Sequence, residues 1–240
     1  MGWNPGTEKE IFSLPSLIQE FSIEKIQKSA AIFNPQKLDW LNGFYIRQRS
    51  LEKLTEECLP YLIKTELIKP YFETESYPFV FYGVKTISTK FEIKELGKQI
   101  SFQELMKIIG LYQERLKKLS EIPELIDFFF KEKLDYLPEL LRWKEMNNKE
   151  IEEVLNKLTK VLNKIKEEDW TKREIGEILL KLAGELGKED RGYLLWPLRV
   201  ALTGKKASAG PFEIAELLGK KETLERIKMA KEKLKEITNE

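Results

Sequence analysis

The chain has 240 residues, 34% of them charged, and 41 basic side chains nearly balance 40 acidic ones. This length suffices for one large or two small domains with buried cores, and the balanced charge shows no overall preference for nucleic acid. With no histidine and a single cysteine, zinc sites, histidine-based acid–base catalysis and internal disulfides are excluded. No apolar run reaches the roughly 18 residues of a membrane span and no signal-peptide core is present, which predicts a soluble cytoplasmic protein.

Short helices are predicted in the first fifty residues. Ser13 and Ser22 each precede an apolar-periodic run, and Asn34 stands before Pro35 at the start of another. Such residues cap helices because their side-chain oxygens accept hydrogen bonds from free backbone N–H groups. Between residues 25 and 49, five basic residues stand against one acid. We define residues 25–49 as the first basic patch.

An amphipathic helix is predicted over residues 50–68, with Ser50 as its cap and a perturbation near Pro60. Its Cys58 is expected to be a buried small residue rather than a reactive thiol. Residues 69–100 differ, because aromatic and β-branched residues alternate loosely between positions 77 and 93. This pattern predicts a short hairpin or an ordered loop.

The second basic patch lies on a helix predicted over residues 101–119. Ser101 and Glu104 form a capping box at its start. Between residues 107 and 119, four cations stand against one acid, and Arg115 shares a face with Lys118. Arg115 either complements the negative end of the helix dipole or belongs to a binding surface. Another helix is predicted to follow, through Phe130.

The rest of the chain is almost purely helical in pattern. Apolar spacings of three and four predict helices over residues 139–146, 149–166, 171–186 and 223–237. The change in pattern at Pro138 suggests a domain boundary near residue 135. Three tryptophans in this part are expected to anchor the core rather than to stack on bases; they are Trp143, Trp170 and Trp196.

The third basic patch, residues 193–212, contains no acid and is punctuated in a distinctive way. Two apolar runs begin with Pro197 and Pro211 and end with Gly204 and Gly219. Since proline suits a first helical turn and glycine the position after the last, two short helices are predicted. Between them, residues 204–210 form a small-residue loop with Lys205 and Lys206, aimed at a helix amino terminus. Free N–H groups there favour an anion such as phosphate or a nucleotide.

Catalytic machinery is not recognisable in the sequence. No glycine-rich phosphate loop appears, no strand alternates regularly with helix, and the many carboxylates on Glu/Lys-rich helices are typical of surface ion pairs. These observations leave two classes of function. The chain is either a binding module that uses the three basic patches or a helical protein-interaction scaffold whose basic patches are incidental.

Two motifs carry a resemblance to a known family. Phe33-Asn-Pro-Gln-Lys-Leu-Asp-Trp-Leu-Asn-Gly-Phe-Tyr-Ile-Arg47 and Leu195-Trp-Pro-Leu-Arg-Val-Ala-Leu-Thr-Gly204, with residues 208–214 and 217–220, resemble the carboxyl-terminal half of bacterial glutamyl-tRNA synthetases. The resemblance extends from Gly2 to about Arg226, and residues 69–100 look like an insertion. The family's catalytic Rossmann domain is missing, so the resemblance implies a fragment that is non-catalytic by itself.

The resemblance implies an all-α fold of two consecutive helical bundles, of the anticodon-binding α-helical cage type. A stem-contact remnant would occupy residues 1–49, a first anticodon-binding subdomain residues 50–135 and a second residues 136–240. The complete enzyme would attach glutamate to tRNA-Glu with ATP and Mg²⁺, whereas this chain would need no cofactor. A cytoplasmic monomer without membrane contact is expected.

The resemblance also gives individual residues roles. The stem of the tRNA would be contacted by Lys37, Trp40, Asn42 and Arg47. Arg115 falls where the family has an arginine facing the third anticodon base, which favours tRNA-Glu over tRNA-Gln. The first anticodon base would be bound by Arg199, Thr203, Ser208, Gly210 and Pro211, with Lys205 and Lys206 beside them. Ala209 stands where many relatives have proline, which predicts a less rigid loop.

Overall fold

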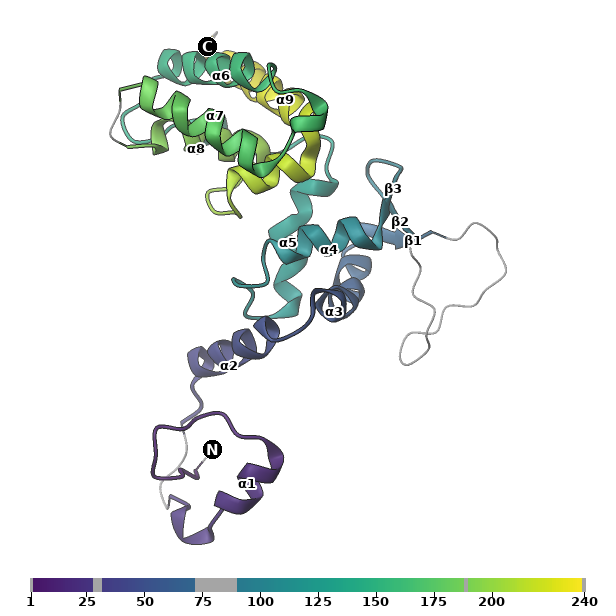
Figure 1. Ribbon diagram of the computed structural model, residues 1–240, viewed down its shortest axis with the longest axis vertical. Coiled ribbons are helices and arrows are strands. Elements are labelled where there is room, and N and C mark those ends of the chain that lie inside the picture. The colour runs from purple at the N-terminus through teal and green to yellow at the C-terminus, as the bar shows by residue number, and fades with distance from the viewer. Residues whose placement is uncertain (1, 28–31, 72–89, 188–189, 239–240) are drawn as a thin grey trace.

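The chain forms an elongated row of helices in three successive parts (Figure 1). The computed structural model describes residues 2–27, 32–71, 90–187 and 190–238. The amino-terminal segment lies at one end, a middle group of helices with a small sheet follows, and helices α6 to α9 lie at the other end (Figure 1). The fold is all-α apart from this small sheet, so the predicted fold class is confirmed.

The amino-terminal segment contains two capped helices and little core. In α1 (Leu14–Glu20) the hydroxyl of Ser13 accepts from the Ser16 N–H, and in α2 (Pro35–Arg47) the Asn34 side chain accepts from the Lys37 N–H. Ser22 begins only the three-residue 3₁₀ helix η1 (Ile23–Lys25), without a side-chain cap. No residue between 2 and 27 is buried, so this segment has few apolar contacts to hold it.

The middle group encloses a core of apolar side chains. Its helices are α3 (Leu51–Lys64), α4 (Phe102–Gly110) and α5 (Ile122–Ile126), with the 3₁₀ helices η2 (Leu119–Glu121) and η3 (Asp127–Phe130). Its antiparallel sheet contains β1 (Ile68–Pro70), β2 (Lys90–Ile93) and β3 (Lys98–Ser101) in that order. The β2–β3 hairpin pairs Phe91 with Ile100, which confirms a hairpin in this region. Most of the aromatic pattern that predicted it, residues 77–89, lies outside the described residues.

Two predictions about the middle group have different outcomes. Cys58 is fully buried, as predicted, and burial raises the pKa of its thiol to about 12. The helix predicted to reach residue 119 ends at Gly110 instead. After it the chain turns so that Tyr112 and Leu116 enter the core. Arg115 therefore lies on a turn, where its N–H donates to the Tyr112 carbonyl, and not in the last turn of a helix.

Four long helices make up the far group: α6 (Asn148–Leu162), α7 (Lys172–Glu185), α8 (Gly192–Thr203) and α9 (Pro211–Thr238). The prediction of a helix over residues 139–146 is wrong. Only the 3₁₀ helix η4 (Pro138–Leu141) forms there, and the backbone becomes extended at Arg142. A second 3₁₀ helix, η5 (Glu167–Asp169), precedes α7. No helix within the described residues is long and apolar enough to cross a membrane.

The glycines and prolines mark the ends of α8 and α9 as predicted, with one exception. Gly204 ends α8 in the left-handed conformation, Pro211 begins α9, and Gly219 interrupts α9 with a φ of 78°. Pro197, predicted to begin a helix, lies in the middle of α8. Interior proline costs a backbone hydrogen bond. Here it is buried among apolar neighbours of α8, and their packing offsets that cost.

The three tryptophans anchor the far group, as predicted. Trp143 and Trp196 pack their rings against each other, with centroids 4.9 Å apart. Trp170 is buried. Each indole N–H is also satisfied, by the Asp190 carboxylate, the Leu140 carbonyl and the Ala215 carbonyl respectively. Buried indoles of this kind fix helices in position because one end is apolar and the other is hydrogen bonded.

Candidate nucleic-acid interface

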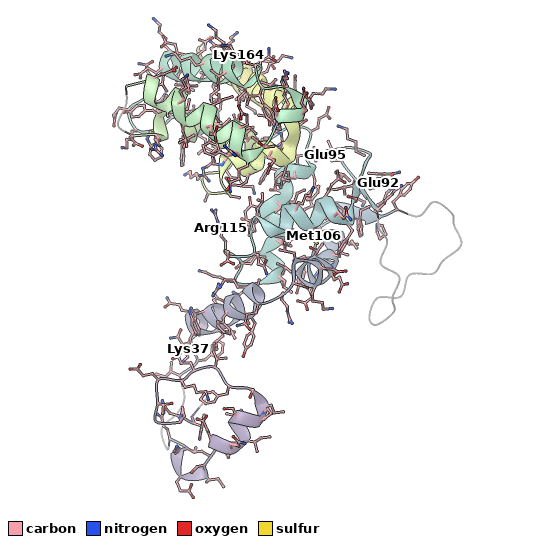
Figure 2. All side chains as sticks on the ribbon, viewed as in Figure 1. Lys37, Glu92, Glu95, Met106, Arg115 and Lys164 are labelled. Carbon is pink, nitrogen blue, oxygen red and sulfur yellow. The ribbon has the colours of Figure 1, made fainter. Side chains whose placement is uncertain are left out.

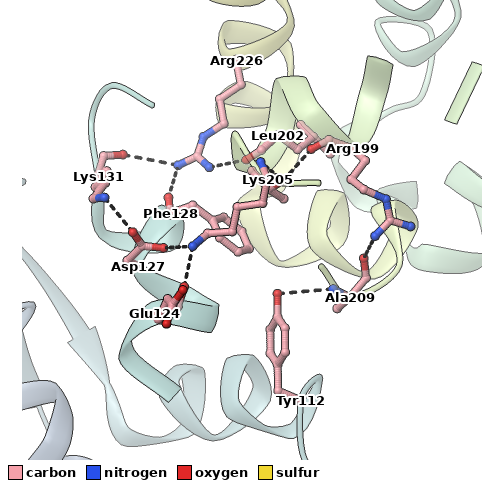
Figure 3. A network of polar contacts seen from close by, with 11 residues as sticks. Tyr112, Glu124, Asp127, Phe128, Lys131, Arg199, Leu202, Lys205, Ala209 and Arg226 are labelled. Atoms are coloured by element: carbon pink, nitrogen blue, oxygen red, sulfur yellow. Dashed lines mark hydrogen bonds and ion pairs between the residues drawn. The ribbon is translucent and has the colours of Figure 1, made fainter. Parts of the chain in front are cut away.

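The loop between α8 and α9, residues 204–210, is held by both helical groups (Figure 3). Two arginines converge on a single acceptor there. Arg199 of α8 donates from Nη1 to the Ser208 carbonyl at 2.9 Å and to the Ser208 hydroxyl at 2.9 Å. Arg115, from the turn after α4, donates to the same Ser208 carbonyl. The second and third basic patches therefore meet at one residue of this loop.

The converging guanidiniums leave positive charge that the protein does not fully neutralise. Burial lowers the pKa of Arg199, and the charge of Arg115 lowers it further, while Glu213 acts in the opposite direction. The Glu213 carboxylate lies 2.8 Å from Lys172, with which it forms an ion pair. Among the described residues, neither Arg115 nor Arg199 has a partner at Nε or Nη2. These fork-shaped donors suit a phosphate oxygen or the edge of a base.

Contacts from the middle group fix the rest of the loop. The Ala209 N–H donates to the hydroxyl of Tyr112, at 3.3 Å (Figure 3). Lys205 Nζ lies 2.7 Å from Asp127 Oδ1 and also donates to the Glu124 carbonyl. Lys205 is thus committed to the protein rather than presented to solvent as the sequence suggested. Lys206 is exposed and has no partner among the described residues.

Three of the predicted site residues shape the loop from inside. Thr203 and Ser208 are both buried. The Thr203 hydroxyl donates to the Arg199 carbonyl at 2.8 Å and accepts from the Lys205 N–H at 3.1 Å. A side chain at Gly210 would meet the Glu213 carboxylate, since an added Cβ would lie 2.0 Å from its oxygen. Pro211, also predicted, is buried as it opens α9.

The predicted stem-contact residues lie apart from this loop, on α2. Lys37, Trp40 and Arg47 are spaced by three and seven residues and so share one face of the helix, whereas Asn42 lies on another. Trp40 is 49% exposed and stacks on Phe44 with centroids 6.0 Å apart. Lys37 forms an ion pair with Glu10 at 2.7 Å.

Two of the predicted site residues from different stretches of the sequence can be located in Figure 2. Lys37 and Arg115 lie on one side of the elongated chain in Figure 2, while Glu92 and Glu95 lie on the other. Lys118 links the parts, because its Nζ is 3.2 Å from the Asp39 carboxylate of α2. Lys37 and Arg115, which were predicted from separate stretches, therefore lie toward the same side in this view.

Arg226 is a buried residue that joins the end of α8 to the middle group, a contact that sequence reasoning missed. It is only 3% exposed and donates to the Leu202 carbonyl at 2.6 Å and the Phe128 carbonyl at 2.8 Å (Figure 3). Burial lowers the pKa of Arg226, which the ion pair with Glu222 at 2.7 Å opposes. Its position in a Lys/Glu-rich helix resembled that of a solvated surface residue, so the sequence carried no signal for this role.

No cluster of metal ligands is found in the part of the chain that the structure describes. No group of three or more cysteine, histidine, aspartate or glutamate residues there could hold a metal ion. The side chains around residues 204–210 are mainly cations and neutral donors, and the two carboxylates nearby, Asp127 and Glu213, are each paired with a lysine. They suit an anionic or base-bearing ligand and offer no set of oxygens for Mg²⁺.

Comparisons with known proteins agree with an RNA-reading site. A model of the anticodon binding domain family matches residues 53–231. Glutamate–tRNA ligase of Clostridium botulinum is 39% identical over 242 residues, which cover 98% of this chain and 41% of that protein. The corresponding protein of Clostridium tetani is 40% identical, over 100% of this chain and 42% of its own. The chain therefore spans about two fifths of the length of these relatives.

A solved structure shows the same arrangement of elements. The crystal structure of a glutamate tRNA ligase from Elizabethkingia meningosepticum, in complex with its amino acid, superposes with a TM-score of 0.68 and 27% identity. The match covers 96% of this chain and 39% of that one. The similarity thus extends over all three parts of the chain.

Proposed function

Because this chain belongs to the anticodon binding domain family, we propose that it is the tRNA-reading part of a glutamate–tRNA ligase. The complete enzyme would attach glutamate to tRNA-Glu with ATP and Mg²⁺, in the cytoplasm. The chain covers about two fifths of its relatives, so ligation is assigned to the whole enzyme. This part would act as a monomer that binds and orients tRNA.

The convergence of Arg115 and Arg199 at Ser208 is the observation that supports this function best. Anticodon bases are unstacked and can be read on their edges by arginine and by backbone groups. Both guanidiniums are oriented by the Ser208 carbonyl, to which Arg199 adds the Ser208 hydroxyl and the Ala209 carbonyl, and each keeps further N–H donors for a ligand. Arg115 is proposed to read the third anticodon base, and Arg199 with residues 208–211 the first.

Contacts to the RNA backbone would supply affinity along the same side. Lys206 is exposed without a protein partner among the described residues, and the α2 stripe of Lys37, Trp40 and Arg47 is suited to the stem. Such contacts position the RNA but carry little sequence information. The division into residues 1–49, 50–135 and 136–240 belongs to this proposal. Stem contact, third-base reading and first-base reading would lie in those parts in turn.

Binding of tRNA transcripts to the chain tests the proposal directly. Affinity for tRNA-Glu should exceed that for a transcript with an altered third anticodon base by about 5- to 150-fold, the usual value of one good base contact. The affinity should fall linearly with the logarithm of salt concentration, with a slope set by the phosphates contacted. Equal affinity for both transcripts would contradict the assignment of Arg115.

A second function, that of a protein-interaction scaffold, is favoured by one feature of the amino-terminal segment. Several large apolar side chains there are exposed, among them Leu14 at 69%, Ile18 at 69% and Ile23 at 73%. Exposed apolar patches often mark protein contacts. If Arg199→Ala and Lys205→Ala leave tRNA affinity unchanged while protein is still captured, the scaffold is the better description.

A further inference from the structure

The loop of residues 204–210 is joined to the middle group by an ion pair that none of the base-reading roles requires. Asp127 begins η3, and its Oδ1 lies 2.7 Å from Lys205 Nζ, with which it forms an ion pair. Its other oxygen, Oδ2, accepts from Lys131 at 2.6 Å. One half-buried carboxylate therefore holds two lysines, of which only Lys205 belongs to the loop (Figure 3).

The Asp127–Lys205 pair lies beside the contacts that orient both arginines. Lys205 is separated from Ser208 by two residues, and Ser208 carries the carbonyl to which Arg115 and Arg199 donate. Next to it, the Ala209 N–H donates to Tyr112. If Lys205 were released, the hydrogen bonds that remain between the loop and the middle group among the described residues would be those of Ser208 with Arg115 and of Ala209 with Tyr112. The position of the shared carbonyl, and with it the direction of both guanidiniums, would then be less fixed.

We propose that Asp127 is a positioning residue for anticodon reading: by holding Lys205, it fixes the loop so that Arg115 and Arg199 read their bases as one unit. This inference rests on the proposed function and extends it to a residue that touches no RNA. It also explains why Lys205, a lysine of the loop, is turned toward the protein. In the ion pair with Asp127, Lys205 is not available to a phosphate, and its position fixes the geometry of the neighbouring loop residues.

The proposal predicts a loss of discrimination between anticodons, which simple electrostatics does not predict. Removing a negative charge near bound RNA should strengthen binding, because it reduces repulsion of the phosphates. Removing a positioning carboxylate should instead weaken discrimination between anticodons, because the donors lose their preset direction. The released Lys205 would also become available to a phosphate, so binding would become more dependent on salt while becoming less selective.

Asp127→Asn is the test variant, since it keeps the shape of the side chain and removes its charge. Affinities of the whole chain for tRNA-Glu and for the transcript with an altered third anticodon base give a discrimination ratio. We expect Asp127→Asn to lower this ratio by about tenfold, a coupling typical of residues in one network. The slope of log affinity against log salt should increase in magnitude by about one phosphate contact.

Lys131→Met is the matched control. Lys131 pairs with the same carboxylate but belongs to the middle group, so its loss leaves the link to the loop intact. The control should keep the wild-type discrimination ratio within about twofold, and circular dichroism should show native helicity for both variants. An unchanged ratio in a folded Asp127→Asn, or tighter binding with full selectivity, would overturn the proposal.

Amide hydrogen exchange at Ala209 separates this inference from the proposed function. Its N–H is protected by the bond to Tyr112, so exchange there should accelerate in Asp127→Asn and not in Lys131→Met, without any RNA. A wild-type chain that shows no anticodon preference would defeat the proposed function, and the positioning role in RNA reading with it. Unchanged exchange, together with retained wild-type selectivity, would defeat the positioning role alone.

Discussion

Arg115 and Arg199 are 84 positions apart in the sequence, yet both donate a hydrogen bond to the carbonyl oxygen of Ser208. Two like charges share one neutral acceptor, an arrangement that is favourable when an anion or a base edge takes the remaining donors. The residues proposed to read the third and the first anticodon base are therefore linked through Ser208 in the free protein. A change at one should be felt by the other.

Replacing Arg115 by lysine should relax anticodon discrimination while most of the binding free energy for tRNA is kept. Lysine keeps the charge but lacks the planar fork that can hold a base edge and the Ser208 carbonyl together. We expect affinity for tRNA-Glu to fall by about 1–3 kcal/mol, and affinity for the transcript with an altered third base to change little. Competition binding with the two transcripts measures this. A uniform loss for both would show that Arg115 contacts only phosphate.

The neighbouring lysines of the loop should behave differently from each other. Lys206→Met should lower the salt slope of tRNA binding by about one and leave thermal stability unchanged, because Lys206 is exposed and unpaired among the described residues. Lys205→Met should instead lower the unfolding temperature, because it leaves the half-buried Asp127 with one partner fewer. Binding across a salt series, with thermal melts of both variants, provides the comparison. Equal effects in the two would contradict the contacts described for Lys205.

Among substitutions of charged residues in α9, Arg226→Met should be the most destabilising. The methionine would fill similar space, but the carbonyls of Leu202, Phe128 and Lys131 would lose their donor. Buried acceptors left unsatisfied cost about 1–3 kcal/mol each, so a loss of about 3 kcal/mol or more in the free energy of unfolding is expected. Urea denaturation measures it. Arg173→Ala, at a side chain 87% exposed and paired only with Glu177, is the control and should cost less than about 0.5 kcal/mol.

Asp190 should make stability depend on pH in the acid range. Hydrogen bonds from Lys144, the Gly192 N–H and Trp143 lower its pKa to about 2, against about 3.9 in an unfolded chain. Because the folded pKa is depressed, ionised Asp190 contributes stability that is complete above about pH 4 and is lost as the pH falls through about 2.

Asp190→Asn should therefore lower the unfolding midpoint at neutral pH and flatten its decrease between about pH 4 and pH 2. Glu153→Gln, which removes an exposed charge from α6, serves as the reference. Denaturant midpoints of wild type and both variants, measured across this pH range, test the prediction. Parallel curves for wild type and Asp190→Asn would show that the carboxylate contributes nothing to the fold.

The sequence by itself determined the local structure wherever one short pattern controlled it. Ser50 and Ser101 cap their helices, Gly204 ends α8 and Pro211 begins α9, because capping oxygens, left-handed glycine and the fixed φ of proline act over a few residues. Helical periodicity likewise predicted an all-α fold. The same short motifs carried the family resemblance, and the residues they marked in the loop are found together.

Only the tertiary structure decided how distant residues meet. Pro197 lies inside α8, and the helix after Ser101 stops at Gly110, because burial of neighbouring apolar side chains outweighs local preference. From the sequence, Lys205 and Lys206 had the same role beside the loop and Arg226 had none, yet of these three residues the structure leaves only Lys206 exposed and unpaired within its described part. Whether a cation forms an ion pair or hydrogen bond within the protein depends on carboxylates and carbonyls from other elements. These contacts have no signature in the linear sequence.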